Sequence, residues 1–212
     1  MDSADFTALR HEYEAAGLSE QDAGDDPIAL FERWLEDAIG AGLDEPNAMV
    51  VATATPDGSP SVRTVLLKQL DERGLVFFTS YASRKGREIA ANPRAAVVMP
   101  WHPLQRQIRV EGPVERVDPA DSDAYFATRP LGSRIAAIAS PQSEPVSGRD
   151  ELDRRYAQVE RSGGEIERPE SWGGYRIGWE TVEFWQGRRN RFHDRLRFRR
   201  EGGRWTRDRL AP

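Results

Sequence analysis

The spacing of apolar residues divides the chain into a helical start and a long run of strands. Between residues 27 and 39, apolar side chains recur every three or four positions, the period of a helix with one buried face. Asp26 and Pro27 supply an N-cap and a proline at the first helical position. A similar pattern between residues 6 and 16 predicts an earlier helix, which Gly17 ends.

From Met49 onward, short apolar runs alternate with turn sequences such as Pro56–Ser59 and the pair Gly202-Gly203. Strands are expected over residues 49–55, 61–70, 75–79, 95–99, 105–117, 175–180, 182–186, 195–201 and 204–210. Helices are expected from Ser83 to Asn92, from Asp118 to Thr128, from Ser133 as N-cap to Ala139, and over residues 150–160. Strands joined by short turns predict an α+β fold, mainly antiparallel, with a barrel or strongly curled sheet and peripheral helices.

The chain shows no internal repeat and no linker. A single domain over residues 1–212 is therefore expected, with residues 1–26 as a mobile N-terminal segment.

Composition limits the possible partners and cofactors. The absence of cysteine excludes disulfides, thiolate metal ligands and thiol catalysis. Since no apolar run could cross a bilayer and no signal peptide is evident, a cytoplasmic protein without membrane association is expected. A net charge of -5 argues against nucleic-acid binding, although the basic cluster from Arg188 to Arg200 keeps a nucleic-acid module open as the least favoured alternative. The three histidines lack metal-ligand spacing, so no metal site is expected.

The segment from Glu183 to Arg195 concentrates candidate chemistry. If the chain is extended here, Arg191, His193 and Arg195 project to one side, with Phe192 on the other. Guanidinium donors can hold a phosphate or the electron-rich edge of a flavin, and an imidazole can move a proton near neutral pH. The alternative is an edge strand whose charges face water.

Two groups of residues elsewhere predict anion sites. Ser83-Arg84-Lys85 joins two cations to the free N–H groups of a helix start. Lys68, Tyr125, Arg129 and Ser133 can form a second site, because Tyr125 and Arg129 lie one helical turn apart. Lys68 and Lys85 are the chain's only lysines. Arg63 and Lys68 are five residues apart, so a regular strand would place them on opposite faces, where they would serve two ligands unless the strand bulges.

These residues belong to an ordered set of motifs that resembles the pyridoxine/pyridoxamine 5'-phosphate oxidase family, a class of FMN-binding split-barrel flavoproteins. The matching segments are Arg63–Lys68, Phe77–Thr79, Ser83–Lys85, Trp101-His102, Arg106-Gln107, Tyr125–Ser133, Gln142-Ser143, Trp172–Gly174, Glu183–Arg195 and Asp208–Pro212. They cover nearly the whole chain. Two positions depart from the family pattern, since Phe78 stands where some members have Tyr and Phe192 where Leu is common.

The resemblance implies an FMN split barrel that oxidises pyridoxamine 5'-phosphate and pyridoxine 5'-phosphate to pyridoxal 5'-phosphate, with O2 as electron acceptor and H2O2 as product. It also implies a homodimer whose flavin sites lie at the subunit interface. The FMN contacts that it implies are Arg63, Thr64, Val65, Leu66, Leu67, Lys68, Phe78, Thr79, Arg84, Lys85, Gln107, Gln142, Ser143, Trp185 and Arg195. The implied substrate contacts are Arg10, Tyr13, Lys68, Tyr125, Arg129, Ser133, Arg191 and His193, of which Arg191 and His193 are the catalytic pair.

Two further alternatives remain open at this point. A split-barrel FMN oxidoreductase with another substrate would share the flavin contacts, but it has no need of the substrate set. A non-catalytic carrier of pyridoxal 5'-phosphate would bind the product without flavin-dependent turnover. The sequence leaves open the preference between the amine and the alcohol, any second pyridoxal 5'-phosphate site, and which subunit supplies each residue.

Overall fold

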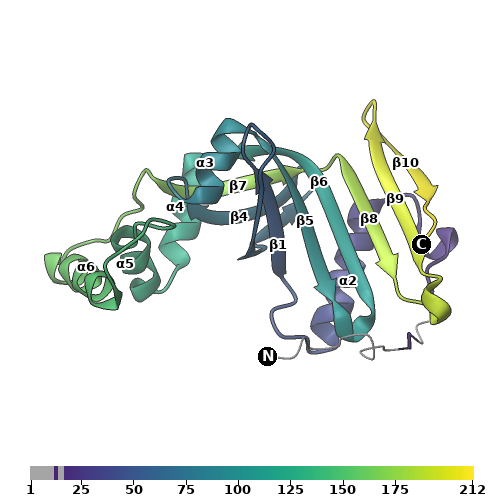
Figure 1. Cartoon of the computed structure of the whole chain (residues 1–212), viewed down its shortest axis with the longest axis horizontal. Helices are drawn as coiled ribbons and strands as arrows, with labels where there is room; N and C mark the ends of the chain where they lie inside the picture. Colours follow the sequence, from purple (N-terminus) through teal and green to yellow (C-terminus); the bar gives the residue numbers. More distant parts are fainter. Residues whose placement is uncertain (1–11, 14–16) are drawn as a thin grey trace, which may run out of the picture. The chain divides into compact units, whose positions relative to one another are not determined.

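The structure is a computed structural model that describes residues 12–13 and 17–212 (Figure 1). Its strands are β1 (Ala48–Ala54), β2 (Pro60–Leu66), β3 (Gln69–Asp71), β4 (Gly74–Ser80), β5 (Arg94–Trp101), β6 (Arg106–Arg116), β7 (Trp172–Gly178), β8 (Thr181–Gln186), β9 (Asp194–Glu201) and β10 (Arg204–Arg209). Its helices are α1 (Glu20–Ala23), α2 (Pro27–Gly40), α3 (Arg84–Ala91), α4 (Pro119–Thr128), α5 (Leu131–Ala139) and α6 (Arg149–Ser162), with 3-10 turns η1 (His102–Leu104) and η2 (Arg189–Arg191).

The chain divides into two compact units. Unit 1 comprises Met1–Pro46, Val98–Val110 and Thr181–Pro212, and unit 2 comprises Asn47–Val97 and Glu111–Glu180. The expectation of a single domain with a mobile start stays a prediction. No helix in the described part of the chain is long and apolar enough to cross a membrane.

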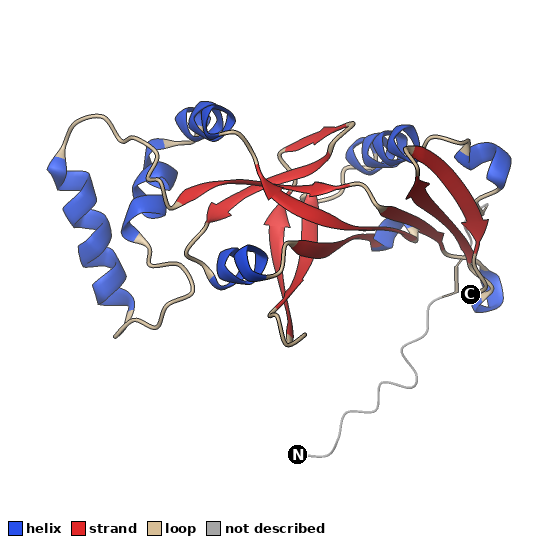
Figure 2. Ribbon diagram, turned by 90° about the horizontal axis from the view of Figure 1, so that it is seen from above, coloured by secondary structure: helices blue, strands red, loops and turns tan. Residues whose placement is uncertain are grey.

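Unit 2 is built on two strand sets, β2-β1-β5 and β3-β4-β7-β6, in which β1 with β2, β3 with β4, β4 with β7 and β6 with β7 pair antiparallel. Figure 2 draws the strands of the chain in red and its helices in blue. Phe77 and Ile177 are fully buried on β4 and β7, which pair along their whole length. Gly112 lets β6 approach the chain end of β7, because a Cβ there would lie 1.8 Å from the carbonyl oxygen of Gly178. Helix α3 begins where its sequence predicts, since the Ser83 hydroxyl accepts a hydrogen bond from the Gly86 N–H.

Unit 1 contains β10-β9-β8, the start of β6 and the end of β5, with α2 packed against them. Trp34 of α2 meets Phe184 of β8 edge to face, with ring centroids 5.2 Å apart. Arg106 stacks over Trp34 at 4.5 Å and bonds Asp37 at 2.6 Å. Phe31 and Trp34 of the helical stripe predicted over residues 27–39 are buried as expected, but the prediction is wrong at its end, because Ile39 is 58% exposed. The paired strands confirm the mainly antiparallel α+β prediction.

The prediction of one strand over residues 61–70 is wrong. The chain leaves β1 after Leu66, the Leu67 N–H donates to Asn47, and the Lys68 N–H donates to the Val76 carbonyl of β4. This change of partner separates β2 from β3 and removes the regular alternation that placed Arg63 and Lys68 on opposite faces.

The expected N-cap at Ser133 is also wrong. Helix α5 starts at Leu131 after Pro130 and has no side-chain cap, so Ser133 lies within the first helical turn. Pro130 occupies the N-cap position with the backbone angle that proline presets, and the helix begins three residues earlier than a Ser133 N-cap would allow.

Candidate functional site

Unit 2 contains a cavity of about 690 Å³ that gathers most of the predicted binding residues. Strand β2 and the segment after it supply one part of the lining, β4 and α3 another, α4 and α5 a third, and β7 and the loop after α5 the rest. The lining residues are Arg63, Thr64, Val65, Leu66, Lys68, Phe78, Thr79, Lys85, Tyr125, Thr128, Arg129, Pro130, Ser133, Gln142 and Trp172. Arg63 and Lys68 both line this cavity, because β2 ends at Leu66 and regular strand alternation does not continue to Lys68.

Lys85 is a buried cation of this cavity. Its side chain donates from Nζ to Thr79 Oγ1 at 3.0 Å and to Ser83 Oγ at 3.2 Å, and both partners are neutral. Burial, and secondly the charge of Arg63, lower the pKa of Lys85 to about 8. A buried ammonium without a counter-ion is stabilised by an anionic ligand, so the start of α3 is suited to a phosphate.

Arg129 supplies a second cation at the end of α4. Its guanidinium stacks 4.6 Å over the Trp172 ring, and its Nη1 is buried without a hydrogen-bond partner among the described residues. Burial lowers the pKa of Arg129, yet a guanidinium stays charged. A buried donor of this kind requires a partner, which an anionic ligand would provide.

Three aromatic rings form a flat stack beside these cations. The centroids of Phe78 and Tyr125 are 4.0 Å apart with a 19° angle between the rings, and the nearly parallel Trp172 ring lies beside both, 5.6 Å from Phe78 and 6.2 Å from Tyr125. Nearly parallel rings of this kind suit a planar aromatic ligand. The hydroxyl absent at Phe78 leaves Tyr125 as the phenol of the stack.

Gln142 fixes the loop that follows α5 to β4. Its Oε1 accepts from Thr79 Oγ1 at 3.1 Å and from the Ser80 N–H at 3.2 Å. Ser143 next to it has a left-handed backbone with φ of 73°. These contacts hold the amide of Gln142 at the cavity wall.

Unit 1 has its own cavity of about 460 Å³, lined by Tyr13, Pro100, His102, Gln105, Arg106, Gln107 and Trp185. His193 lies against two of the lining rings, with its centroid 4.6 Å from Trp185 and 5.5 Å from Tyr13. His102 is an exposed member of the lining.

The protonation state of His193 follows from its hydrogen bond. Its Nδ1 accepts from the Arg188 N–H at 3.1 Å, which places the proton of the neutral ring on Nε2. Burial, and secondly the charge of Arg191, lower its pKa. His193 is therefore suited to donate a hydrogen bond from Nε2 near neutral pH.

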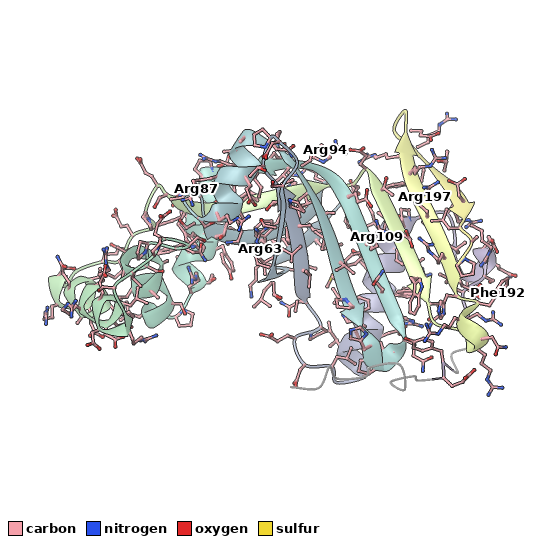
Figure 3. All side chains as sticks on the ribbon, in the orientation of Figure 1. Arg63, Arg87, Arg94, Arg109, Phe192 and Arg197 are labelled. Atoms are coloured by element: carbon pink, nitrogen blue, oxygen red, sulfur yellow. The ribbon has the colours of Figure 1, made fainter. Side chains whose placement is uncertain are left out.

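The expectation that Arg191, His193 and Arg195 lie on one side of an extended segment is wrong at Arg191. Arg191 ends the 3-10 turn η2, and it and Asn190 have left-handed φ angles of 58° and 56°. Such angles are strained for residues other than glycine, and they turn the chain away from the strand path. Phe192 on the same loop is 76% exposed (Figure 3).

Arg195 is held in place from two sides. Its Nε donates to Glu183 Oε1 at 2.8 Å, and its Nη1 donates to the Ala211 carbonyl at 2.9 Å. Glu183 is buried and also accepts from Arg109 at 3.2 Å. The C-terminal tail and a buried carboxylate thus fix the direction of the Arg195 guanidinium.

Comparison with known proteins decides the family. Residues 35–162 match the model described as "Pyridoxamine 5'-phosphate oxidase", and residues 172–212 match the "Pyridoxine 5'-phosphate oxidase C-terminal dimerisation region". The chain belongs to the pyridoxamine 5'-phosphate oxidase family. This confirms the resemblance drawn from the sequence.

Relatives in this family are similar over nearly their whole length. The chain is 59% identical, over 98% of its length and 97% of the relative's, to a protein of Rubrobacter xylanophilus named pyridoxine/pyridoxamine 5'-phosphate oxidase. A protein of the same name from a Nocardioides species is 53% identical, with both chains fully covered.

Two solved structures share the fold of this chain. PhzG from Burkholderia lata, solved with tetrahydrophenazine-1-carboxylic acid, is 32% identical with a TM-score of 0.89, covering 95% of this chain and 100% of that one. A pyridoxamine 5'-phosphate oxidase-related, FMN-binding protein from Nostoc punctiforme is 18% identical with a TM-score of 0.70, covering 86% and 97%. The split-barrel prediction is confirmed by these folds.

Several of the predicted contacts do not line either cavity. Leu67 is buried, and Arg84 and Ser143 neighbour lining residues without lining the unit 2 cavity themselves. Arg10 lies outside the described residues. No group of acidic or histidine side chains that could hold a metal ion occurs in residues 12–13 and 17–212.

Sequence reasoning missed two buried carboxylates and one aromatic wall residue. Trp172 was part of a matching motif but not a predicted contact. Glu88 stands four residues after Arg84, a helical ion-pair spacing that could have singled it out. Glu183 contacts Arg109 and Arg195 because their strands lie beside its own, and the spacing of these residues along the chain gives no sign of the contacts.

Proposed function

We propose that this chain is an FMN-dependent oxidase that converts pyridoxamine 5'-phosphate and pyridoxine 5'-phosphate to pyridoxal 5'-phosphate, with O2 as electron acceptor and H2O2 as product. The observation that carries the proposal is the unit 2 cavity, where Lys85 and Arg129 are cations that no carboxylate pairs among the described residues. Relatives 51–59% identical over at least 96% of this chain bear the name of this oxidase. The match to a dimerisation region supports a homodimer.

The residues of unit 2 fit FMN. The start of α3 offers Lys85, and Arg63 and Arg84 nearby, to a phosphate. Thr79 and Gln142 offer polar atoms to the edge of a flavin ring, and Phe78 offers an aromatic face. When bound, FMN supplies the two-electron acceptor of the reaction and is reoxidised by O2.

The other end of the same cavity fits the phosphate of the substrate. Arg129 would donate from its buried Nη1, and Lys68, Tyr125 and Ser133 would add an ammonium and two hydroxyls. Anchoring the phosphate fixes the position of the pyridine ring, which lowers the entropic part of the barrier.

The residues proposed to act on the substrate ring are His193, Arg191 and Tyr13. His193 would donate a hydrogen bond from Nε2, because its Nδ1 is occupied by the Arg188 N–H. Arg191 would orient the ring, and Tyr13 would cover it beside Trp185. Arg195 would place a fixed positive charge where the cofactor gains negative charge.

An anaerobic titration tests the proposal. FMN-loaded protein is mixed with pyridoxamine 5'-phosphate while the visible flavin band is recorded, and air is then admitted. Bleaching, recovery in air and appearance of pyridoxal 5'-phosphate are expected. Bound FMN with an unchanged band would instead favour a family member with another substrate, and pyridoxal 5'-phosphate binding without any FMN would favour a carrier.

A further inference from the structure

Glu88 is a buried carboxylate behind the cations of the unit 2 cavity. It lies on α3, and its side chain is 4% exposed. Its Oε1 accepts from Arg84 Nε at 2.8 Å, and its Oε2 accepts from Ser61 Oγ at 2.6 Å and from Thr53 Oγ1. The Arg63 Nη2 lies 3.3 Å from the same Oε2. One carboxylate thus contacts two arginines and two hydroxyls.

The two hydroxyls relay the effect of Glu88 to Arg63. Each hydroxyl has a single proton, and both protons are directed at Glu88 Oε2. The hydroxyl oxygens are therefore left as acceptors, and Arg63 donates from Nη1 to Thr53 at 2.5 Å and from Nη2 to Ser61. Without the carboxylate, the hydroxyl protons would lose the acceptor that holds them in this direction.

The charges around the start of α3 match a phosphate monoester. Arg63, Arg84 and Lys85 are three cations, and Glu88 is the carboxylate among them, which leaves two positive charges. A phosphate monoester carries close to two negative charges at neutral pH. Arg63 lines the cavity near Lys85, whereas Glu88 does not line it.

From these contacts we propose that Glu88 is a positioning residue that directs Arg63 and Arg84 toward the phosphate of the flavin, so that the site selects FMN over riboflavin. This inference rests on the proposed function. Glu88 acts through the two arginines and does not touch the ligand. Burial alone would raise the pKa of Glu88, but the hydrogen bonds from Ser61, Thr53 and Arg84 and the charge of Arg63 lower it to about 2, so the carboxylate is ionised near neutral pH.

The selectivity between the two flavins separates positioning from general stabilisation. A merely structural carboxylate would affect both flavins equally when removed, because both place the same ring system against the same wall. A purely electrostatic role would have the opposite sign, because removing a negative charge strengthens phosphate binding. Only loss of arginine positioning weakens FMN while it spares riboflavin.

The experiment measures the dissociation constants of FMN and riboflavin for the apoprotein by fluorescence quenching. In Glu88→Gln, the preference for FMN over riboflavin is expected to fall about tenfold, the effect of about one charge-assisted hydrogen bond, with riboflavin binding unchanged. Glu180→Gln is the matched control, because Glu180 pairs with Arg94 through two bonds on the surface of the same unit. Its flavin preference should equal that of the unmodified chain.

Ser61→Ala provides a second variant that leaves no altered charge in the interior. It removes one relay hydroxyl between Glu88 and Arg63 and should lower the preference several-fold, even if Glu88→Gln does not fold. An unchanged or increased preference for FMN in these variants would overturn the inference. Failure of the proposed function looks different, since the unmodified chain would then bind no FMN or would not oxidise the substrate.

Discussion

The two units of the chain treat their cations differently. In unit 1, carboxylates pair with many arginines: Asp194 holds Arg188 at 3.2 Å and Arg209 at 2.7 Å, and Asp208 holds two more on β9. Figure 3 labels two of the paired cations, Arg109 on β6 and Arg197 on β9.

In unit 2, several cations that line the cavity have no carboxylate partner among the described residues. Within the part of the chain that the structure describes, no carboxylate lies within ion-pair distance of Lys68, Lys85 or Arg129. The comparison teaches that the density of arginines does not locate an anion site. The most arginine-rich strands form a paired framework, while the cations around the unit 2 cavity include those that still need a partner.

The largest expected effect comes from breaking the pairing in unit 1. Glu183→Gln would place a neutral amide at a buried position beside two arginines whose side chains are 41% (Arg109) and 26% (Arg195) exposed. Removing one partner of a buried ion pair costs about 3 kcal/mol of the free energy of unfolding. Chemical denaturation of the apoprotein measures this loss. Glu201→Gln, at an exposed pair with Arg199, should cost under about 1 kcal/mol, and equal losses in the two variants would contradict the distinction.

A somewhat smaller effect is expected when a cation of the unit 2 cavity is removed. Arg129→Ala should weaken binding of pyridoxamine 5'-phosphate about thirtyfold, because it removes charge-assisted hydrogen bonds from a buried donor. Because pyridoxamine 5'-phosphate would react, the dissociation constant is measured with pyridoxal 5'-phosphate, which has the same phosphate and does not reduce the flavin. The measurement is an equilibrium titration of the FMN-loaded protein under anaerobic conditions. The dephosphorylated ligand is the control, and its affinity should not change.

The smallest predicted effect is a pH dependence of FMN binding. The folded pKa of Lys85, lowered to about 8, means that the apoprotein loses this cation as the pH rises above 8. FMN affinity should then fall by up to about tenfold per pH unit, while riboflavin affinity stays flat. If the FMN affinity did not change between pH 7 and pH 9.5, Lys85 would not contact the phosphate.

The lowered pKa of Lys85 affects the stability of the apoprotein in the opposite direction: FMN affinity falls with pH, whereas the contribution of Lys85 to stability rises. The unfolded chain holds the Lys85 proton up to the ordinary pKa of 10.5, whereas the folded chain releases it near 8. The unfolded state therefore binds more protons between these values, and the contribution of Lys85 to stability rises with pH there. Comparison of Lys85→Met with the unmodified chain over this range isolates the contribution.

Local signals in the sequence predicted much of the fold. The Asp26-Pro27 start of α2, the Ser83 cap of α3 and the Gly202-Gly203 hairpin depend on neighbouring residues, and all three form as expected. The end of β2 at Leu66 depends on hydrogen bonds to the carbonyls of Asn47 and Val76, which lie on other segments of the chain. A pattern of alternating residues carries no information about such a change of partner.

The candidate site was predictable to a similar extent. The cations and aromatic residues of the unit 2 cavity follow from the motifs, but the left-handed turn at Asn190 and Arg191 does not, because neither residue is glycine. Glu88 has a local signal in its four-residue spacing from Arg84, but its contact with Arg63 and the contact of Glu183 with Arg195 arise only in the folded structure.

The central claim is that Arg129 anchors the substrate phosphate while Arg191 acts on the substrate ring. The most direct measurement is the rate of anaerobic flavin reduction against pyridoxamine 5'-phosphate concentration, by rapid mixing, in the unmodified chain, Arg129→Ala and Arg191→Ala. Arg129→Ala should raise the half-saturating concentration with a nearly unchanged limiting rate, and Arg191→Ala should lower the limiting rate about a hundredfold. The reverse pattern, or equal changes in both variants, would contradict the account.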